Sequence, residues 1–496
     1  MEKKKVAIIG AGISGITAGV MLLQEGYDVL MYDKNDNIGG LVSGYYVNGH
    51  YIDACLHWLV GTKPGSTINR RWVNNGMLGD DIKLVGLETL GTFEYKGKSV
   101  TFYRDLDKGE AEWIKDFPED EKNIKKFFHA VRSFSKTLDL MDQLGTYNNI
   151  LKTFFAILKI VYGSSAIFKT RKLSREEFAK KNFKSEALRF AFKNVQNGFN
   201  NMLFFIYVYA SFYNGDVDVP VGGALPMMKR AEERFTSLGG KLFLNTPVTE
   251  ITYENKHVTG IIANDEFVKV DAVISTVDPF YTHRVLLNDK FKDKKLFKML
   301  KKEDEHPIVS CFDVYFTIDA DLTNLDVPVG LNVNPIKVGK RETDFLMFRS
   351  YHFDPDYFIK DGKTVVSVLI DQASSDYKFW NDLHEEAKEL YDRENRRIIK
   401  DISNALEERY PEFKGKIEYL THFGPLDIKD RNNNTFGALQ SFSYSEKDGL
   451  FFHNFKVKKL KGLFLASQWS KSVGGTPIAA TNGSGVVSLV KMYLKN

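Results

Sequence analysis

The stretch Val6-Ala-Ile-Ile-Gly10-Ala-Gly-Ile-Ser-Gly15 near the N-terminus decides the fold of this chain. Its first four residues are apolar and mostly β-branched, which suits a buried parallel strand, and a glycine-rich turn follows at once. Residues 16–24 then have the composition of a helix, and residues 27–32 form a second apolar run. Strand, turn, helix and strand in this order predict a βαβ unit.

The spacing of the glycines predicts a dinucleotide site in this unit. Gly10 allows the tight turn, Gly12 lets the backbone approach a pyrophosphate, and Gly15 lets the helix pack closely on the strand. Ser14 lies inside the same turn. Asp33 ends the second strand, 18 residues after Gly15. A carboxylate at that place accepts hydrogen bonds from ribose hydroxyls and repels a 2′-phosphate.

A glycine pair, Gly39-Gly40, follows Asp33, and its spacing resembles the flavin-binding start of the amine oxidase and phytoene desaturase superfamily. In that superfamily the pair lets the chain pass close to the FAD pyrophosphate, and an arginine usually comes next. Leu41 stands at that position here. We therefore expect either that Lys34 supplies the positive charge or that FAD is held more loosely.

Residues 53–61 resemble the family segment that passes beside the isoalloxazine ring. The usual glycines are replaced by Cys55 and Leu56, and the resemblance implies that Cys55 and His57 lie near the flavin. We name His57, and then His422, as the candidate catalytic acid or base. The alternative for Cys55 and His57 is a purely structural role, as a small buried hydrophobe and a satisfied core histidine.

Two later motifs carry the same resemblance. A Pro-x-Gly-Gly turn at residues 220–223 precedes a helix and a strand, which implies that the backbone of Val248 contacts the adenine region of FAD. Residues 473–483 resemble the last FAD-binding element of the phytoene desaturase, carotenoid isomerase and retinol saturase branch. A helix start of this kind exposes backbone N–H groups and a positive dipole end, which stabilise a reduced flavin. The cofactor-binding residues expected there are Gly475, Thr476, Pro477 and Ile478.

The fold class that follows is α/β. It combines a discontinuous FAD-binding domain of the Rossmann type (GR2-like) with an α+β substrate domain and a helical, membrane-facing insertion. Short alternating runs after residue 285 indicate a mixed or antiparallel sheet in the substrate domain. The predicted FAD-binding parts are residues 1–80, 222–284 and 455–496, with the helical region at 81–221 and the substrate-binding sheet at 285–454.

An aromatic, apolar stretch at residues 147–168, with Phe154 and Phe155, lies among clustered cations. A helix of this kind lies in the plane of a membrane interface, with its apolar face among the acyl chains and its cations at anionic headgroups. A helix that caps the substrate cavity is an equally weighted alternative, and a cavity mouth that opens onto a membrane satisfies both. Aromatic residues between 203 and 212 are expected to line the same interior. The cations are Lys152, Lys169, Arg171, Lys172 and Arg175.

The composition excludes several other classes. The 496 residues carry 68 basic and 64 acidic side chains, a net charge of +4, so no global field favours nucleic acid. Two cysteines and ten scattered histidines predict neither a disulfide framework nor a metal site. No apolar run approaches the length that crosses a bilayer. We expect a cytoplasmic protein, peripheral on the inner face of a membrane if the 147–168 helix is interfacial.

The resemblance implies an FAD-dependent oxidoreductase that desaturates, saturates or isomerises carbon–carbon bonds of a long hydrophobic lipid, such as a carotenoid-like polyene. No second glycine-rich fingerprint follows a strand, so the electron acceptor or donor is expected to be external, a quinone or oxygen. Two alternatives stay open: a flavin amine oxidase, and a non-catalytic prenyl-lipid-binding protein on the same fold. The intact glycine turn and Asp33 argue against the second.

Overall fold

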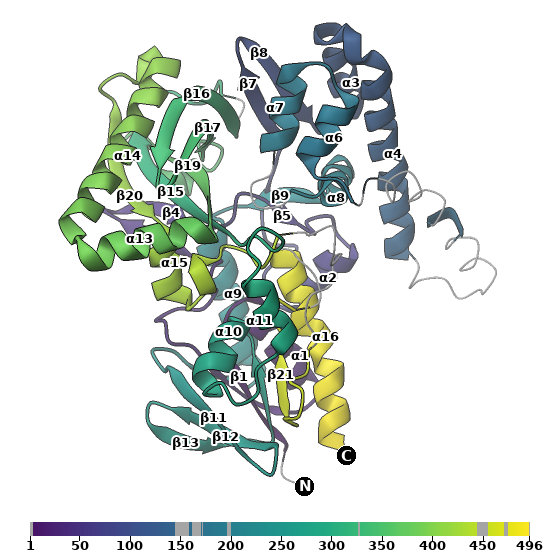
Figure 1. Ribbon diagram of the computed structural model, residues 1–496. Helices are drawn as coiled ribbons and strands as arrows, with labels where there is room; N and C mark the ends of the chain where they lie inside the picture. The colour runs from purple at the N-terminus through teal and green to yellow at the C-terminus, as the bar shows by residue number, and fades with distance from the viewer. Residues whose placement is uncertain are drawn as a thin grey trace.

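The computed structural model describes residues 3–143, 158–160, 170, 172–195, 200–325, 328–443, 455–470 and 475–495 (Figure 1). The predicted interfacial stretch 147–168, with Lys152, Lys169 and Arg171 around it, lies outside the described residues apart from 158–160.

A five-stranded parallel sheet forms the base of the molecule, in the order β10-β2-β1-β14-β21. Its strands come from the start, the middle and the end of the chain, so this domain is discontinuous, as the sequence predicts. The strands are β1 (Lys5–Ile9), β2 (Asp28–Tyr32), β10 (Lys241–Phe243), β14 (Ala272–Ser275) and β21 (Leu463–Leu465).

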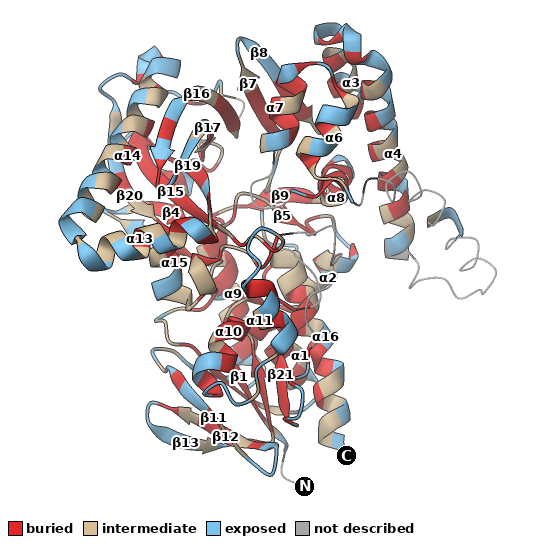
Figure 2. Cartoon of the chain, in the orientation of Figure 1, coloured by how far each residue is buried: buried red, intermediate tan, exposed pale blue. Residues whose placement is uncertain are grey.

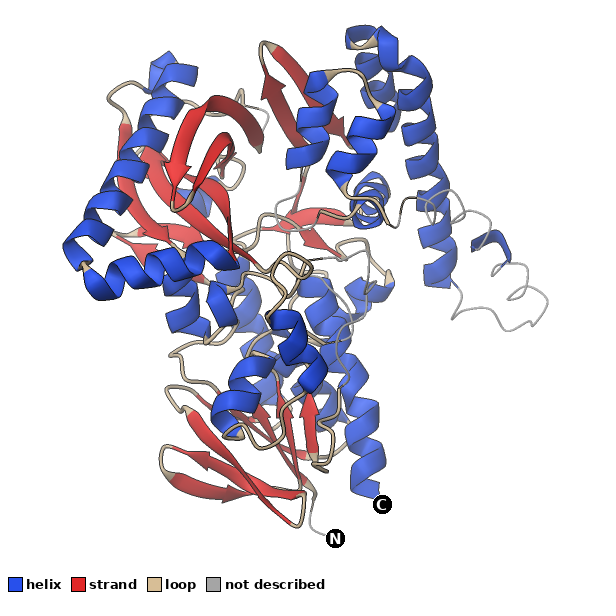
Figure 3. Ribbon diagram, in the orientation of Figure 1, coloured by secondary structure: helices blue, strands red, loops and turns tan. Residues whose placement is uncertain are grey.

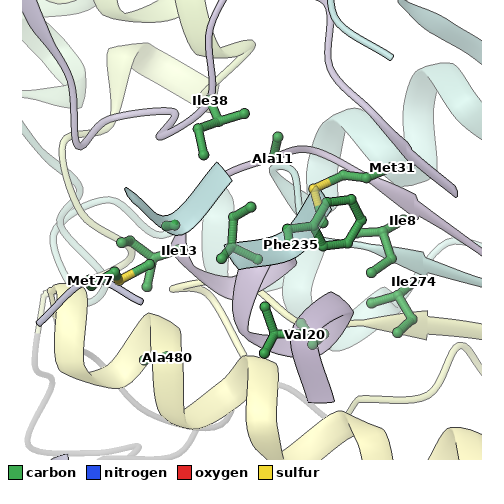
Figure 4. Packing of buried hydrophobic residues seen from close by; sticks show 14 of the residues in the cluster. Ile8, Ala11, Ile13, Val20, Met31, Ile38, Met77, Phe235, Ile274 and Ala480 are labelled. Carbon is green, nitrogen blue, oxygen red and sulfur yellow. The ribbon is translucent and has the colours of Figure 1, made fainter. Parts of the chain in front are cut away.

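Both faces of this sheet are covered, because successive residues of a strand point to opposite sides. Val6 and Ile8 of β1 enter a core with three helices, of which Figure 4 shows a part, whereas Ala7 and Ile9 pack toward a three-stranded antiparallel sheet. The helices are α1 (Ile13–Gln24), α9 (Ala224–Ser237) and α16 (Thr476–Lys495); the sheet is β11 (Val248–Glu254), β12 (His257–Ala263) and β13 (Glu266–Lys269).

An eight-stranded sheet stands above the base. Its pairs are antiparallel except for β16 and β7, which run parallel. Two long helices, α13 and α14, cover one face, and their outer sides are exposed (Figure 2). In order the strands are β20 (Ile417–Phe423), β15 (Val309–Ile318), β19 (Lys363–Ala373), β17 (Arg341–Ser350), β16 (Val329–Val338), β7 (Thr89–Tyr95) and β8 (Lys98–Tyr103), with β18 (Ile359–Lys360) on β19; the helices are α13 (Ser374–Glu386) and α14 (Lys388–Arg409).

Helices gather at the far end of this sheet (Figure 3). Their core is dense in aromatic rings: Phe102 of β8 lies edge-on to Trp113, Phe192, Phe205 and Tyr209, with ring centroids 5.1–5.7 Å apart. The helices are α3 (Leu106–Asp116), α4 (Glu121–Gln143), α6 (Arg175–Asn182), α7 (Glu186–Asn194) and α8 (Met202–Tyr213). Strands β7 and β8 come from the 81–221 segment, so one sheet joins the two segments that the sequence assigns to separate regions.

Short elements connect these parts. They are β3 (Gly44–Val47), β4 (His50–Asp53), β5 (Leu59–Val60), β6 (Leu84–Gly86), β9 (Val217–Pro220), α2 (Thr67–Asn74), α10 (Pro279–Tyr281), α11 (Lys294–Leu300), α12 (Pro355–Phe358), α15 (Pro425–Asn432), the π-helix η3 (Thr282–Leu286), and the 3₁₀ turns η1 (Pro118–Asp120), η4 (Pro411–Phe413) and η5 (Thr435–Gly437). Among the helices that the structure describes, none combines the length and the hydropathy needed to span a membrane.

Candidate functional site

A cavity of about 450 Å³ lies at the carboxyl ends of β1, β2 and β14. This edge of a parallel sheet is where α/β folds bind their ligands. One side of the cavity is made by the turn after β1, the loop after β2 and the start of α16. The opposite side is made by β15, β17 and β19 of the eight-stranded sheet and by α8. The side of the cavity that carries the dinucleotide motifs therefore faces a side made by the eight-stranded sheet and α8.

The structure brings nearly all of the predicted site residues to this cavity. Two do not line it: Gly15 lies beneath the glycine turn, and His422 lies elsewhere. Those that line it are Gly10, Gly12, Ser14, Asp33, Lys34, Gly39, Gly40, Leu41, His57, Val248, Gly475, Thr476, Pro477 and Ile478.

Packing within the turn requires glycine at two positions. Gly10 has a φ of +99°, a conformation that other residues rarely adopt. A Cβ on Gly15 would lie 2.1 Å from the carbonyl oxygen of Gly10, which leaves no room for a side chain between helix and strand. These two residues shape the turn.

Gly12 and Gly475 have a different environment. A Cβ on Gly12 would meet nothing closer than the carbonyl oxygen of Gly39, at 3.6 Å, and one on Gly475 would meet nothing within 4 Å. The packing of the described residues therefore does not demand glycine at either place, whereas a cofactor that approaches the backbone does. Helix α1 also begins here with no acidic residue in its first turn, which leaves its positive end free for phosphate. The residues present fit a flavin dinucleotide.

Asp33 is held in a fixed orientation at the end of β2. Its Oδ2 accepts from the backbone N–H of Ala11 at 2.8 Å, and its Oδ1 accepts from the backbone N–H of Asn35 at 2.9 Å. The side chain is buried and lines the cavity. A carboxylate that is oriented in this way matches the expected ribose contact.

Two cations, Lys34 and Arg431, line the cavity after β2 and on α15. Lys34 donates to the carbonyl oxygen of Asp430 and to Oδ1 of Asn433, at 2.5 and 3.1 Å, so it is already engaged by protein groups. Burial lowers its pKa, against the opposing effect of Asp33. Arg431 of α15 lines the same part of the cavity, and its buried Nε has no hydrogen-bond partner among the described residues. Arg431 is also partly engaged, because its Nη2 donates to Oδ1 of Asn37 at 2.8 Å. Both cations therefore stay candidates for the phosphate contact missing at Leu41.

His57 faces the cavity from the loop before β5. The hydroxyl of Tyr351 lies 3.5 Å from its Nδ1. Burial, and then the charge of Arg349, lower the pKa of His57 well below its usual range, so its ring is neutral at pH 7. Cys55 lies beside it, and burial, with the charge of Asp53, raises the pKa of that thiol to about 12. The lowered pKa makes His57 a hydrogen-bonding group and a weak proton acceptor, and the raised pKa of Cys55 favours its uncharged thiol.

His422 lies away from the cavity. It lines a separate cleft between α14 and β20, where its Nδ1 is 2.8 Å from the hydroxyl of Tyr419. The next residue, Phe423, does line the cavity. Because neighbouring residues of a strand face opposite ways, the side of β20 that carries His422 points to α14. The structure thus does not place His422 where it could contact a flavin or its substrate.

The side of the cavity that the eight-stranded sheet forms carries polar groups that no sequence pattern marked. Cys311 and Asp313 of β15 and Arg349 of β17 all line the cavity. Burial raises the pKa of Asp313 to about 6, against the opposing effects of the Tyr315 hydrogen bond and of Arg349. Each lies within an ordinary alternating strand pattern, so no sequence motif marks it.

Comparison with known proteins agrees with this geometry. The profile of the family described as flavin containing amine oxidoreductase matches residues 13–486. A 4,4′-diapolycopen-4-al dehydrogenase of Metabacillus indicus is 22% identical over 98% of this chain and 96% of its own length. A neurosporene-forming phytoene desaturase of Rhodobacter capsulatus is 27% identical over 59% of this chain and 57% of its own length. The crystal structure of an oxidoreductase from Methanosarcina mazei has the same fold, with a TM-score of 0.60 at 16% identity over 98% of this chain and 100% of that one.

Proposed function

This chain belongs to the flavin-containing amine oxidoreductase family, and from that premise we propose that it acts on carbon–carbon bonds of a long hydrophobic lipid of the carotenoid-like polyene class. FAD is its cofactor, and it is an FAD-dependent oxidoreductase. Relatives named for polyene substrates support the proposal, since one of them aligns over nearly the whole chain.

The observation that carries the proposal is the apolar surface opposite the nucleotide side. Helix α8 divides its aromatic residues: Phe205 and Tyr209 are buried in the helical core, whereas Phe204 and Tyr207 line the cavity. A hydrocarbon chain that covers such a surface gains about 25 cal/mol for each Å² removed from water. Other apolar residues of this surface are Trp58, Leu369, Leu439 and Trp469.

Bound FAD supplies the two-electron transfer, and the residues of the chain supply position and a dry environment. Phe204, Tyr207 and Trp469 line the cavity and orient the lipid in it. Burial and the charge of Arg349 lower the pKa of His57, which makes its ring a weak proton acceptor, so we assign it a hydrogen-bonding role toward the lipid or the flavin. The external electron partner that we propose is a quinone or oxygen.

Anaerobic titration of the FAD-loaded protein tests this function. Adding a carotenoid-type polyene in detergent to the oxidised protein should bleach the blue absorbance of the flavin if the lipid is dehydrogenated. If the lipid is saturated or isomerised, the chemically reduced protein should alter the polyene spectrum instead. A quinone or air should then restore the oxidised spectrum. Absence of any change in both experiments would contradict the proposal.

An amine oxidase is the second candidate, favoured by the description of the family as a whole. Adding primary amines and polyamines under air should then bleach the flavin and release peroxide, with no response to polyenes. A protein that is colourless as purified and takes up no FAD would instead support a non-catalytic lipid-binding function.

We also propose peripheral contact with a membrane, because the substrate would be delivered from one. The proposal concerns the 147–168 stretch, so its test uses that stretch directly. Replacing Phe154 and Phe155 with Ser should move the protein from anionic vesicles into solution. Phe267→Ser, at an exposed position on β13, is the matched control and should leave vesicle binding unchanged. Equal binding by both variants would show that the stretch is not interfacial.

A further inference from the structure

The eight-stranded sheet presents a polar patch to an otherwise apolar cavity wall. Asp313 of β15 is paired with Leu369 of β19, and Leu369 is paired with Met347 of β17. Arg349 lies two residues beyond Met347, on the same face of the sheet. Asp313, Leu369 and Arg349 all line the cavity. The carboxyl of Asp313 and the guanidinium of Arg349 therefore lie on nearby strands, on the side of the cavity opposite the cofactor turn.

Asp313 has one satisfied and one unsatisfied oxygen. Its Oδ2 accepts from the hydroxyl of Tyr315 at 2.7 Å. Its Oδ1 is buried and has no hydrogen-bond partner among the described residues, although the side chain is only 3% exposed. A buried carboxyl oxygen without a partner is unfavourable, because it has lost its hydrogen bonds to water. This oxygen is available to a donor that enters the cavity.

Arg349 is also incompletely paired. Its Nη1 is buried and meets no acceptor in the part of the chain that the structure describes. Its charge acts on both neighbours: after burial, it is the next cause that lowers the pKa of His57, and it opposes the rise in the pKa of Asp313. Arg349 therefore lines the cavity with an unpaired donor, within electrostatic reach of both His57 and Asp313.

Apolar residues beside Arg349 and Asp313 make their unpaired polar atoms unfavourable unless a ligand pairs with them. Leu41, Leu439 and Leu369 pack with Cys311 next to the patch. A guanidinium and a carboxyl beside such apolar groups are stabilised by hydrogen-bonding partners. A pure hydrocarbon provides none, whereas a lipid with an oxygenated end provides both a donor and an acceptor.

We propose that Arg349 and Asp313 bind an oxygenated end group of the substrate, so that this enzyme takes a polyene with a carboxyl or carbonyl terminus and not a bare hydrocarbon. The oxygen of that group accepts from Nη1 of Arg349. A carboxyl group fits best when it shares one proton with Asp313, because the protonated partner then donates to an oxygen of the other, at Oδ1 of Asp313. This inference rests on the proposed function, since it assigns a substrate class to the same cavity.

Ligand binding to the FAD-loaded protein tests the subsite. The probes share one skeleton and differ at one end: all-trans-retinoic acid, all-trans-retinal and the analogue that ends in a methyl group. Dissociation constants are read from the change in flavin fluorescence. The wild-type protein should bind the acid at least about tenfold more tightly than the methyl analogue, as one charge-assisted hydrogen bond predicts.

Variants of Arg349 test whether this residue causes the preference for the acid. Arg349→Met should remove the preference for the acid and leave binding of the methyl analogue within about threefold. Arg349→Lys should keep part of the preference, because it retains the charge but not the fork of donors. The control is Arg393→Met, at an exposed position on α14, which should change neither constant.

Three results separate the possible failures. Equal affinity of the wild-type protein for all three probes would overturn the subsite and leave the proposed function intact. A loss of FAD from Arg349→Met would also overturn it, since Arg349 would then hold the cofactor. A wild-type protein that takes up no FAD would overturn the proposed function itself. If Arg349→Met does not fold, the wild-type series alone decides the question.

Discussion

Gly12 and Gly15 belong to one turn but have different roles. Gly15 is required by the protein, because the carbonyl oxygen of Gly10 occupies the place of its side chain. Gly12 has ordinary backbone angles, with φ −77° and ψ −178°, and its missing side chain would project toward the cavity. The first glycine therefore contributes to folding, and the second to cofactor binding.

Alanine substitutions should separate these two contributions. Gly15→Ala should lower the free energy of unfolding by about 2–4 kcal/mol, because helix and strand must move apart. Gly12→Ala should change it by less than about 0.5 kcal/mol in the FAD-free protein. It should nevertheless weaken FAD binding at least about tenfold. Urea unfolding and flavin titration measure the two quantities. If Gly12→Ala bound FAD like the wild type, the pyrophosphate would not lie against Gly12.

At the scale of elements, one carboxylate links the loop beside His57 to the start of α9. Oδ1 of Asp53 accepts from the backbone N–H groups of Cys55 and Leu56, at 3.0 and 2.7 Å, and Oδ2 accepts from that of Ala224, at 2.7 Å. The residue before Ala224 is a glycine and cannot cap the helix through a side chain. Asp53 is fully buried, and burial raises its pKa to about 6 although its three hydrogen bonds oppose the shift.

Removing this cap should cost more than removing an exposed one. Asp53→Ala leaves three buried N–H groups without an acceptor, so we expect a loss of about 3–4 kcal/mol. Asp105→Ala, at the exposed start of α3, removes two comparable bonds and should cost about 1 kcal/mol. Chemical unfolding of the two variants gives the comparison. Similar losses would mean that water or a rearranged loop replaces Asp53.

At the scale of the whole molecule, the cofactor cavity is the place where distant segments meet. Its walls include the first turn of the chain, the β14 region, the eight-stranded sheet and the start of α16. A cofactor that contacts several of these segments stabilises the folded state of all of them, because it binds only after they have come together.

Removal of FAD should therefore lower the melting temperature of the entire protein. At a free FAD concentration one hundred times the dissociation constant, the gain in stability is about 2.7 kcal/mol. Thermal unfolding followed by circular dichroism should show one transition that rises with added FAD. A transition that does not depend on FAD would indicate that the cofactor contacts one rigid segment alone.

The local part of the site could be predicted from sequence, and the non-local part could not. The turn from Gly10 to Gly15 and the acid at Asp33 belong to one short βαβ unit, so their spacing is enough to predict their places. Arg431, Asp313 and Arg349 reach the cavity through strand pairing and helix packing far along the chain. The alternating pattern of a strand also does not tell which of its two faces will line the cavity.

The same limits apply to the wider architecture. The sequence predicted the three-part nucleotide domain, because each part carries its own glycine motif. It did not predict that β7 pairs with β16, since nothing in residues 89–95 specifies a parallel partner more than two hundred positions away. The aromatic residues near 203–212 were assigned to the cavity as a group, whereas the helix divides them between cavity and core.

The strand order β10-β2-β1-β14-β21 has a consequence for biosynthesis. A ribosome delivers β1 and β2 first, but the sheet that they begin lacks its last strand until residues 463–465 are made. The helix start at residues 475–479, which closes one side of the cavity, emerges later still. Before β21 is made, the edge of β14 that it will cover has no strand beside it, and an open edge of this kind can pair with other chains. A chain that stalls before residue 460 therefore lacks both β21 and the start of α16, and it cannot complete the cavity.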